Sequence, residues 1–338
     1  MNDIALEKSN KHVIYWLYAC AFCVILMVAI GGLTRLTDSG LSITEWKPIT
    51  GIIPPLNDEQ WNIEFDKYKA SPEYIHIHNQ INMEQFKNIY LLEFYHRLAG
   101  RAVGLIFFIP LVIFWWKGVL ALNTKYAMIV VAFLGICQGF MGWYMVKSGL
   151  TDSPYVSHFR LTFHLLFALA IYITLIFESL RLKCGIFFLN LDKKWKIMLS
   201  LTILQIALGG LVAGLDAGLI YNEFPKMGDG YIPNELYEIH ISDYFYNQAF
   251  VQFIHRLNAY LVAIYASYLA CFLLNQKQYT QALMILLAVF AQFLLGVITL
   301  LLNVQIWAAN GNQVFAFILI WIIIFAGISS KKKFTINL

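Results

Sequence analysis

The segment GGLTRLTDSGL at residues 31–41 recurs as GGLVAGLDAGL at residues 209–219. Three further matches follow in the same order: YHRLAGR (95–101) with IHRLNAY (254–260), QGFMG (138–142) with QFLLG (292–296), and HLLFA (164–168) with NQVFA (312–316). Ordered matches of this kind indicate an internal duplication, and a duplication determines which fold is expected for the whole chain. The sequence therefore predicts two related halves, residues 1–190 and 191–338.

Composition places most of the chain in lipid. Of its 338 residues, 59% are hydrophobic and 13% are charged, and the mean hydropathy is +0.64. Soluble domains keep about a quarter of their residues charged, and a helix needs roughly 20 apolar residues to cross a bilayer. Eight stretches meet that length: 13–33, 95–116, 126–146, 159–180, 195–215, 250–274, 280–302 and 307–329.

Eight spans in two repeats define the expected fold class. It is an all-α polytopic membrane protein, with eight transmembrane helices arranged as two four-helix bundles. Four helices per half give both halves the same orientation, so a pseudo-twofold axis along the membrane normal is expected to relate them. Nothing in the sequence suggests a nucleic-acid partner, and membrane lipid is the expected surrounding.

The distribution of basic residues predicts the orientation. If both termini lie on one side of the membrane, that side also holds the short segments with Lys11, Arg181, Lys193 and Lys194. Lys and Arg in short loops favour the cytoplasmic side. We therefore expect a multi-pass protein of the cell inner membrane with both termini in the cytoplasm, and long outer loops over residues 34–94 and 216–249.

Three histidines lie inside predicted spans, at similar depth near the outer face. These are His96, His164 and His255. Ionisable residues within a membrane are costly and usually mark a functional site, and imidazole is a common axial ligand of haem iron. Two helices of one bundle that each present a histidine at one level therefore favour haem binding. A zinc site would need further strong ligands, and a proton relay with Glu93 remains an alternative.

Charged residues accompany two of these histidines. Arg97 and Arg256 directly follow His96 and His255. They either pair with haem propionates, since arginine recognises carboxylates through two parallel hydrogen bonds, or extend to water as interfacial arginines. Glu93 lies on the same helical face as His96. It is expected to orient the imidazole or to take part in proton transfer, although a carboxylate near a helix start also stabilises the helix dipole.

These motifs together resemble the haem A synthase family, in its alphaproteobacterial and mitochondrial form. The resemblance rests on GGLTRLTDSGLSITEWKPITGIIPP, EFYHRLAGR, HFRLTFHL, QFIHRLNAY and LLGVITLLLNV, and extends from about residue 13 to residue 329. It implies an oxidoreductase that acts on a CH group. Such an enzyme oxidises a methyl group of haem O to a formyl group in two successive steps, giving haem A for cytochrome oxidase. Haem O synthase is a plausible partner from pathway logic.

The resemblance also implies a role for each candidate residue. Glu93, His96 and His164 would form the catalytic site in the first half, with both histidines at the iron of the substrate haem. His255 would be an axial ligand of a haem b cofactor in the second half. Where the family places a second axial histidine, this chain has Asn312, followed by Gln313. Asparagine is a poor iron ligand, so haem b could be held by His255 alone or by another group, or the site could be empty.

Two other functions use some of the same features. An electron-transfer subunit that oxidises quinol with b-type haems would use the same histidines, but it would not explain why Glu93 lies in only one half. A transporter built from a parallel repeat would place broken helices at the membrane midplane. The polar residues of this chain lie near the outer face instead.

Overall fold

The computed structural model describes residues 11–47, 50–151, 153–184 and 191–336. Within these ranges, eight helices are long and apolar enough to cross a membrane, which confirms the expected all-α polytopic fold. They are α2 (Lys11–Leu36), α5 (Met83–Trp116), α6 (Leu122–Gly149), α7 (His158–Cys184), α8 (Lys193–Gly214), α9 (Gln248–Asn275), α10 (Tyr279–Leu301) and α11 (Ile306–Ile336).

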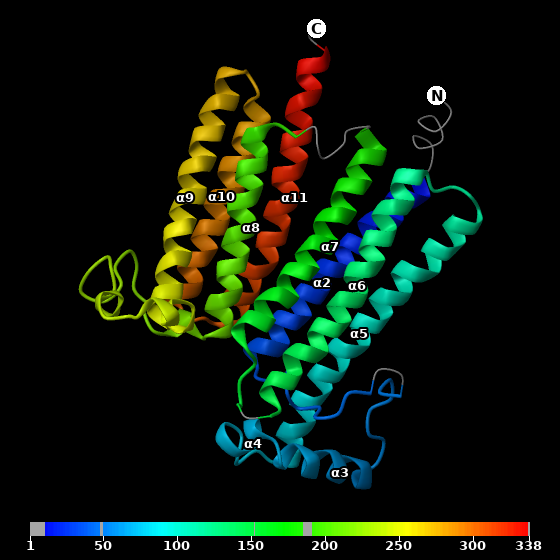
Figure 1. Ribbon diagram of the computed structural model, residues 1–338, viewed down its shortest axis with the longest axis vertical. Coiled ribbons are helices and arrows are strands. Elements are labelled where there is room, and N and C mark those ends of the chain that lie inside the picture. The colour runs from blue at the N-terminus through cyan, green and yellow to red at the C-terminus, as the bar shows by residue number, and fades with distance from the viewer. Residues whose placement is uncertain (1–10, 48–49, 152, 185–190, 337–338) are drawn as a thin grey trace.

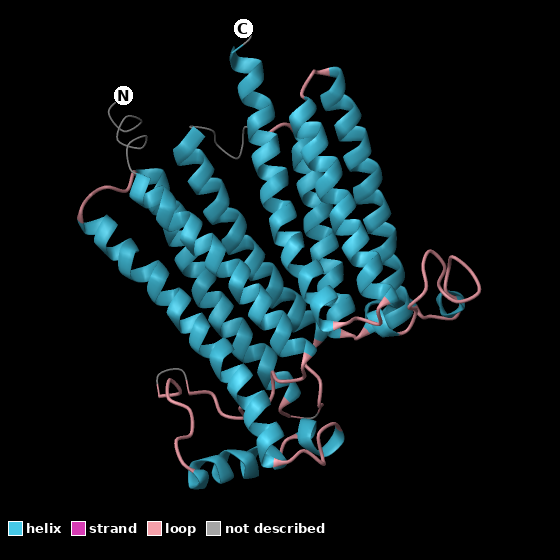
Figure 2. Ribbon diagram, turned by 180° about the vertical axis from the view of Figure 1, so that it is seen from behind, coloured by secondary structure: helices cyan, strands magenta, loops and turns pink. Residues whose placement is uncertain are grey.

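The eight helices form two groups that diverge toward one end of the molecule. Figure 1 shows α2, α5, α6 and α7 on one side and α8 to α11 on the other. The helix α2 begins, and α11 ends, at the same end, and the larger loops gather at the opposite end (Figure 2). The boundary expected near residue 190 lies between α7 and α8, where residues 185–190 are outside the described part of the chain.

The core lies mainly where the two groups meet. There α2 and α7 pack against α8 and α11. The rings of Tyr172 and Phe317 are 5.4 Å apart across this boundary, and both side chains are fully buried. A side-chain carbon at Gly327 would lie only 3.0 Å from the Trp195 ring, so a glycine is needed for this close approach of α11 to α8.

The described parts of the two long outer loops contain short helices. The first contains α3 (Asp58–Lys69) and the short helix α4 (Pro72–His76). A cluster of stacked aromatic rings, with Phe86 fully buried at its centre, packs these helices onto the start of α5. The second contains three turns of 3-10 helix: η2 (Ala217–Leu219), η3 (Asn234–Tyr237) and η4 (Ile241–Tyr246). Both loops therefore cap the same end of the helices.

The second span starts earlier than the sequence suggests. The helix α5 runs without a break from Met83 to Trp116. Asn82 and Gln85 form a reciprocal capping box at its start, which fixes the first turn. The helix therefore extends beyond the apolar stretch by about three turns, and its first residues belong to the outer cap.

The repeat is visible in the backbone. Asp38 and Asp216, at matching positions of the two quoted segments, both adopt left-handed conformations with φ of +47° and +51°. Such a residue commonly ends a helix, and each stands just beyond α2 or α8. Arg35 also pairs with Asp216 and donates to the Ala213 carbonyl, joining the outer ends of α2 and α8. The pseudo-twofold axis itself stays a prediction.

Candidate functional site

The first bundle brings His96 and His164 to the same interior. His96 lies on α5 against Gly31 of α2, where an added side-chain carbon would be 3.4 Å from Nε2. His164 lies on α7 against Gly142 of α6, where the equivalent distance to Cε1 would be 3.2 Å. The two glycines leave space for rings that approach from facing helices, as a ligand pair for one iron requires.

His164 also meets an amide. The Gln138 side-chain nitrogen lies 3.2 Å from its Nε2, whereas its Nδ1 is buried without a hydrogen-bond partner. A buried polar atom without a partner is costly. This one lies in the bundle interior, so it suits a site that is completed by a bound group.

The second bundle repeats this arrangement around His255. It lies on α9 against Gly209 of α8, where an added carbon would be 3.3 Å from its Cε1. Here, however, the side-chain nitrogen of Gln205 lies 3.2 Å from the imidazole nitrogens. Asn258 in turn donates to the Gln205 side-chain oxygen over 2.7 Å. His255 is thus positioned by two amides, while the matching positions in the first bundle hold Met27 and Ala99.

Asn312 occupies the place in the second bundle that His164 has in the first. Gln292 of α10 donates to its side-chain oxygen over 2.6 Å. Gly296 lies nearby, and an added carbon there would be 4.0 Å from the same oxygen. These glutamines and glycines align in the sequence repeats, but they were not among the predicted site residues. Gln138 and Gln292 each lie one helical turn before the glycine of their repeat. This recurrence is a sequence pattern from which contact with a ligand could have been predicted.

Glu93 is buried beneath the outer loop, with 2% of its surface exposed. One carboxylate oxygen accepts hydrogen bonds from the Ser42 hydroxyl, at 2.6 Å, and from the Ile43 N–H, at 2.8 Å. The other oxygen pairs with Arg97 at 2.6 Å. Three donors, one of them cationic, fix the orientation of this carboxylate. The matching residue of the second bundle is Gln252, which carries no charge.

Arg97 and Arg256 hold the outer loops in equivalent ways. Arg97 donates to the carbonyls of Ile43 and Glu45. Arg256 donates to the carbonyls of Tyr221 and Glu223, which are the matching loop positions. These hydrogen bonds give each guanidinium a contact that anchors the loop. The contact with haem propionates that the sequence suggested stays a prediction.

Comparison with known proteins identifies relatives over nearly the whole chain. Residues 14–324 match the family model described as "Cytochrome oxidase assembly protein". A protein named "Heme A synthase" from Rickettsia bellii (strain RML369-C) is 47% identical over 326 residues, covering 93% of this chain and 97% of that protein. Proteins of the same name from Rickettsia felis and Rickettsia canadensis are 48% and 46% identical, each covering 91% of this chain and 95% of their own length.

Proposed function

Because this chain belongs to the cytochrome oxidase assembly protein family, and within it to the haem A synthases, we propose that it oxidises a methyl group of haem O to a formyl group. The oxidation has two successive steps. In each step the methyl carbon gains a hydroxyl group from water, loses two electrons to an external electron acceptor and releases two protons. The first step gives an alcohol and the second a gem-diol, and loss of water from the gem-diol leaves the aldehyde of haem A. The enzyme is accordingly an oxidoreductase that acts on a CH group.

The arrangement that supports this proposal is that His96 and His164 each pack against a glycine of a neighbouring helix in the first bundle, and that the buried carboxylate of Glu93 lies on the same helix as His96. Imidazoles from α5 and α7 would bind the iron of the substrate from its two faces, which fixes the ring in the bundle. Gly31 and Gly142 provide the space beside each imidazole. The contribution of the protein is then orientation, electrostatics and exclusion of water, since the haem carries the redox chemistry.

Glu93 is proposed as the proton-handling group. It lies three residues before His96, so the two side chains share one face of α5. Oxidation of a methyl carbon releases protons, and a positioned carboxylate in a water-poor site can accept them. Arg97, Ser42 and the Ile43 N–H hold the carboxylate in place for this task.

The second bundle is proposed to hold haem b through His255. His255 is suited to bind the haem iron, because Gln205 and Asn258 position its imidazole and Gly209 leaves room beside it. The second bundle does not provide a second imidazole, because Asn312 stands at that place. When bound, haem b would supply electron transfer to and from the substrate site. The difference between the two bundles also argues against an electron-transfer subunit with two equivalent haems.

The cellular location and the orientation are also part of the proposal. We place the protein in the cell inner membrane, with both termini in the cytoplasm and the α3–α4 cap outside. Lys11 and Ile336 lie at one end of the helices and that cap lies at the other (Figure 1). The substrate reaches the first bundle from an enzyme that makes haem O, for which haem O synthase is the partner implied by the chemistry.

The test is to purify the full chain, extract its pigments and separate the haem types by chromatography. Incubation with haem O should then yield hydroxylated and formylated products, identified by mass. Haem O or haem A together with haem b supports the synthase with both sites loaded. Two molecules of haem b per chain, without conversion of haem O, would contradict the proposal.

A further inference from the structure

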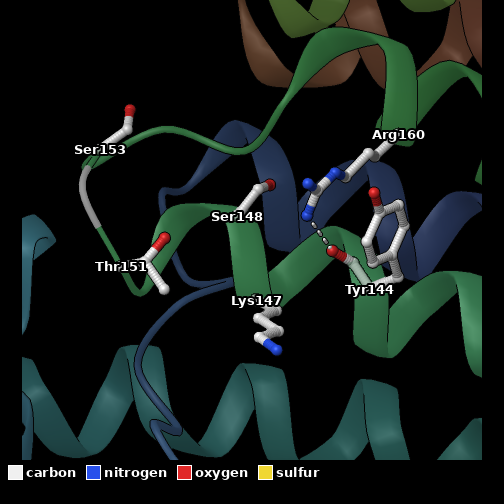
Figure 3. Close-up of a pocket in the computed structure, with 6 residues that line it drawn as sticks. All are labelled: Tyr144, Lys147, Ser148, Thr151, Ser153 and Arg160. Carbon is white, nitrogen blue, oxygen red and sulfur yellow. Dashed lines mark hydrogen bonds between the residues drawn. The ribbon is translucent and has the colours of Figure 1, made fainter.

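A pocket opens at the outer ends of α6 and α7 in the first bundle. Its volume is about 330 Å³, and Figure 3 shows the side chains that line it. They are Tyr144, Lys147, Ser148, Thr151, Ser153 and Arg160. Two cations and four side-chain hydroxyl groups line this pocket, a set of donors suited to a carboxylate or another anion.

Arg160 is held in place within this pocket. Its Nη1 donates to the Tyr144 carbonyl over 2.8 Å, and its guanidinium carbon lies 3.7 Å from the centre of the Tyr144 ring. The bond uses one N–H group, and a guanidinium has four others to offer. A stacked arginine that is fixed in advance loses less entropy when it binds an anion, so it suits recognition of a planar carboxylate.

The pocket is aligned with the proposed substrate site. Arg160 precedes His164 by four residues, so it lies on the same face of α7, about 6 Å closer to the outer end. Lys147 follows Gly142, the residue in contact with His164, by five residues on α6. Both cations therefore lie on the outer side of an iron held by His164. In Figure 3 their side chains leave the rim in different directions, which suits two separate carboxylates.

The second bundle lacks these cations. By the alignment of Gln138 with Gln292 and of His164 with Asn312, Lys147 corresponds to Leu301 and Arg160 to Ala308. The basic rim is therefore no part of the shared bundle architecture. It accompanies the one bundle that must take up and release a haem at every turnover.

We propose that this pocket binds the propionate carboxylates of the substrate haem, with Arg160 and Lys147 as the residues that recognise them. The inference rests on the proposed function. Haem O is amphipathic, with an apolar ring and tail and two carboxylates on one edge. Cations on the outer rim orient that edge toward water while His164 takes the iron, so they set which way round the ring enters the bundle.

The test compares a haem with free propionates and the same haem as its dimethyl ester. Ferric protoporphyrin IX and its dimethyl ester are titrated into the full chain in neutral-lipid nanodiscs, and binding is followed in the Soret region. The binding step that is absent in His164→Ala is assigned to the first bundle. In the unchanged protein this step should be about tenfold or more weaker for the ester, because charge-assisted hydrogen bonds are lost.

The double substitution Arg160→Gln with Lys147→Gln should weaken binding of the free acid about tenfold or more and leave the ester nearly unchanged, so that the two affinities converge. Arg160→Lys should keep part of the preference. Lys125→Gln is the matched control, because Lys125 lies at the inner end of α6 over Trp115. An unchanged content of haem bound through His255 checks that the variants fold.

Two results would overturn the proposal. One is an acid-to-ester ratio that stays the same in the double variant. The other is a double variant that binds haem as the unchanged protein does but no longer retains phosphatidylglycerol on purification. That result would make the pocket a lipid headgroup site. If the unchanged protein has no step that depends on His164, the proposed function fails instead, so the two failures are distinguishable.

Discussion

Gln292 donates a 2.6 Å hydrogen bond to the side-chain oxygen of Asn312, at the place where Gln138 meets His164 in the first bundle. The same pair of helix positions thus carries a glutamine and an imidazole in one bundle and two amides in the other. Asn312 is held in position, but its amide has no nitrogen lone pair with which to bind iron as imidazole does.

The first prediction follows from this difference. Haem bound in the second bundle should be five-coordinate and high-spin, with His255 as its only protein ligand. Asn312→His should convert it to a six-coordinate, low-spin form, because Gly296 leaves the space that Gly142 leaves beside His164. Absorption and electron paramagnetic resonance spectra of the purified protein provide the measurement. A low-spin spectrum before the substitution would mean that another side chain already supplies the sixth ligand.

Glu93→Gln is the second prediction. The substitution keeps the size of the side chain but removes the charge that pairs with Arg97 and the group that accepts a proton. Conversion of haem O should fall about 10²- to 10⁴-fold, the range typical of a lost general base, while haem O still binds. Product mass and haem content are measured together.

Glu84→Gln is the matched control for this experiment, since Glu84 is an exposed carboxylate on the same helix. It should leave conversion unchanged. Full conversion by the Glu93→Gln variant would remove Glu93 from the proton chemistry.

The sequence predicted the helices well because lipid imposes a simple rule on them. Each span needs an apolar run of fixed length, and all eight were located by that criterion. The apolar span at residues 95–116 does not include the first turns of α5, because there capping by Asn82 and packing of Phe86 replace apolarity as the determinant. Such contacts with α3 depend on residues that are distant in sequence.

The site was predictable only in part. Histidines inside spans are conspicuous, so His96, His164 and His255 could be identified directly. Gln205 and Asn258 look like ordinary polar residues of a helix, and only the fold brings them together beside His255. The contacts of Arg97 and Arg256 with loop carbonyls also depend on how the loops return to the bundle, which periodicity does not encode.

The third prediction uses the glycines of α6. A side-chain carbon at Gly142 would lie 3.2 Å from His164, whereas one at Gly139 would meet nothing within 4 Å. Gly142→Ala should displace the imidazole and weaken haem O binding roughly tenfold, since overpacking of this kind costs about 1–3 kcal/mol. Gly139→Ala is the control on the same helix and should bind as before. Binding titrations give both affinities, and equal affinities would show that the imidazole accommodates the added methyl group without loss of binding, contrary to the prediction.

The last prediction concerns Glu73 in the outer cap. This carboxyl is buried, with 3% of its surface exposed, and it accepts a 3.0 Å hydrogen bond from the Tyr68 hydroxyl, which also meets His78. Burial raises the pKa of Glu73 from 4.5 to about 8, and the nearby charge of Asp38 adds to the effect. The folded cap therefore retains a proton that the unfolded segment has already lost.

The sign of the pH dependence follows. Because the folded pKa is raised, this contribution to stability is complete below about pH 4.5 and is lost as pH rises toward 8, by at most about 1.4 kcal/mol per pH unit. Hydrogen exchange of the amides in residues 58–78, corrected for the intrinsic rate, should show local opening that becomes easier from pH 5 to pH 8. Glu73→Gln should remove this slope, because the amide keeps the contact with Tyr68 but does not titrate. If the slope persists in that variant, His78 or Asp38 titrates instead, and the cap does not hold Glu73 in its neutral form.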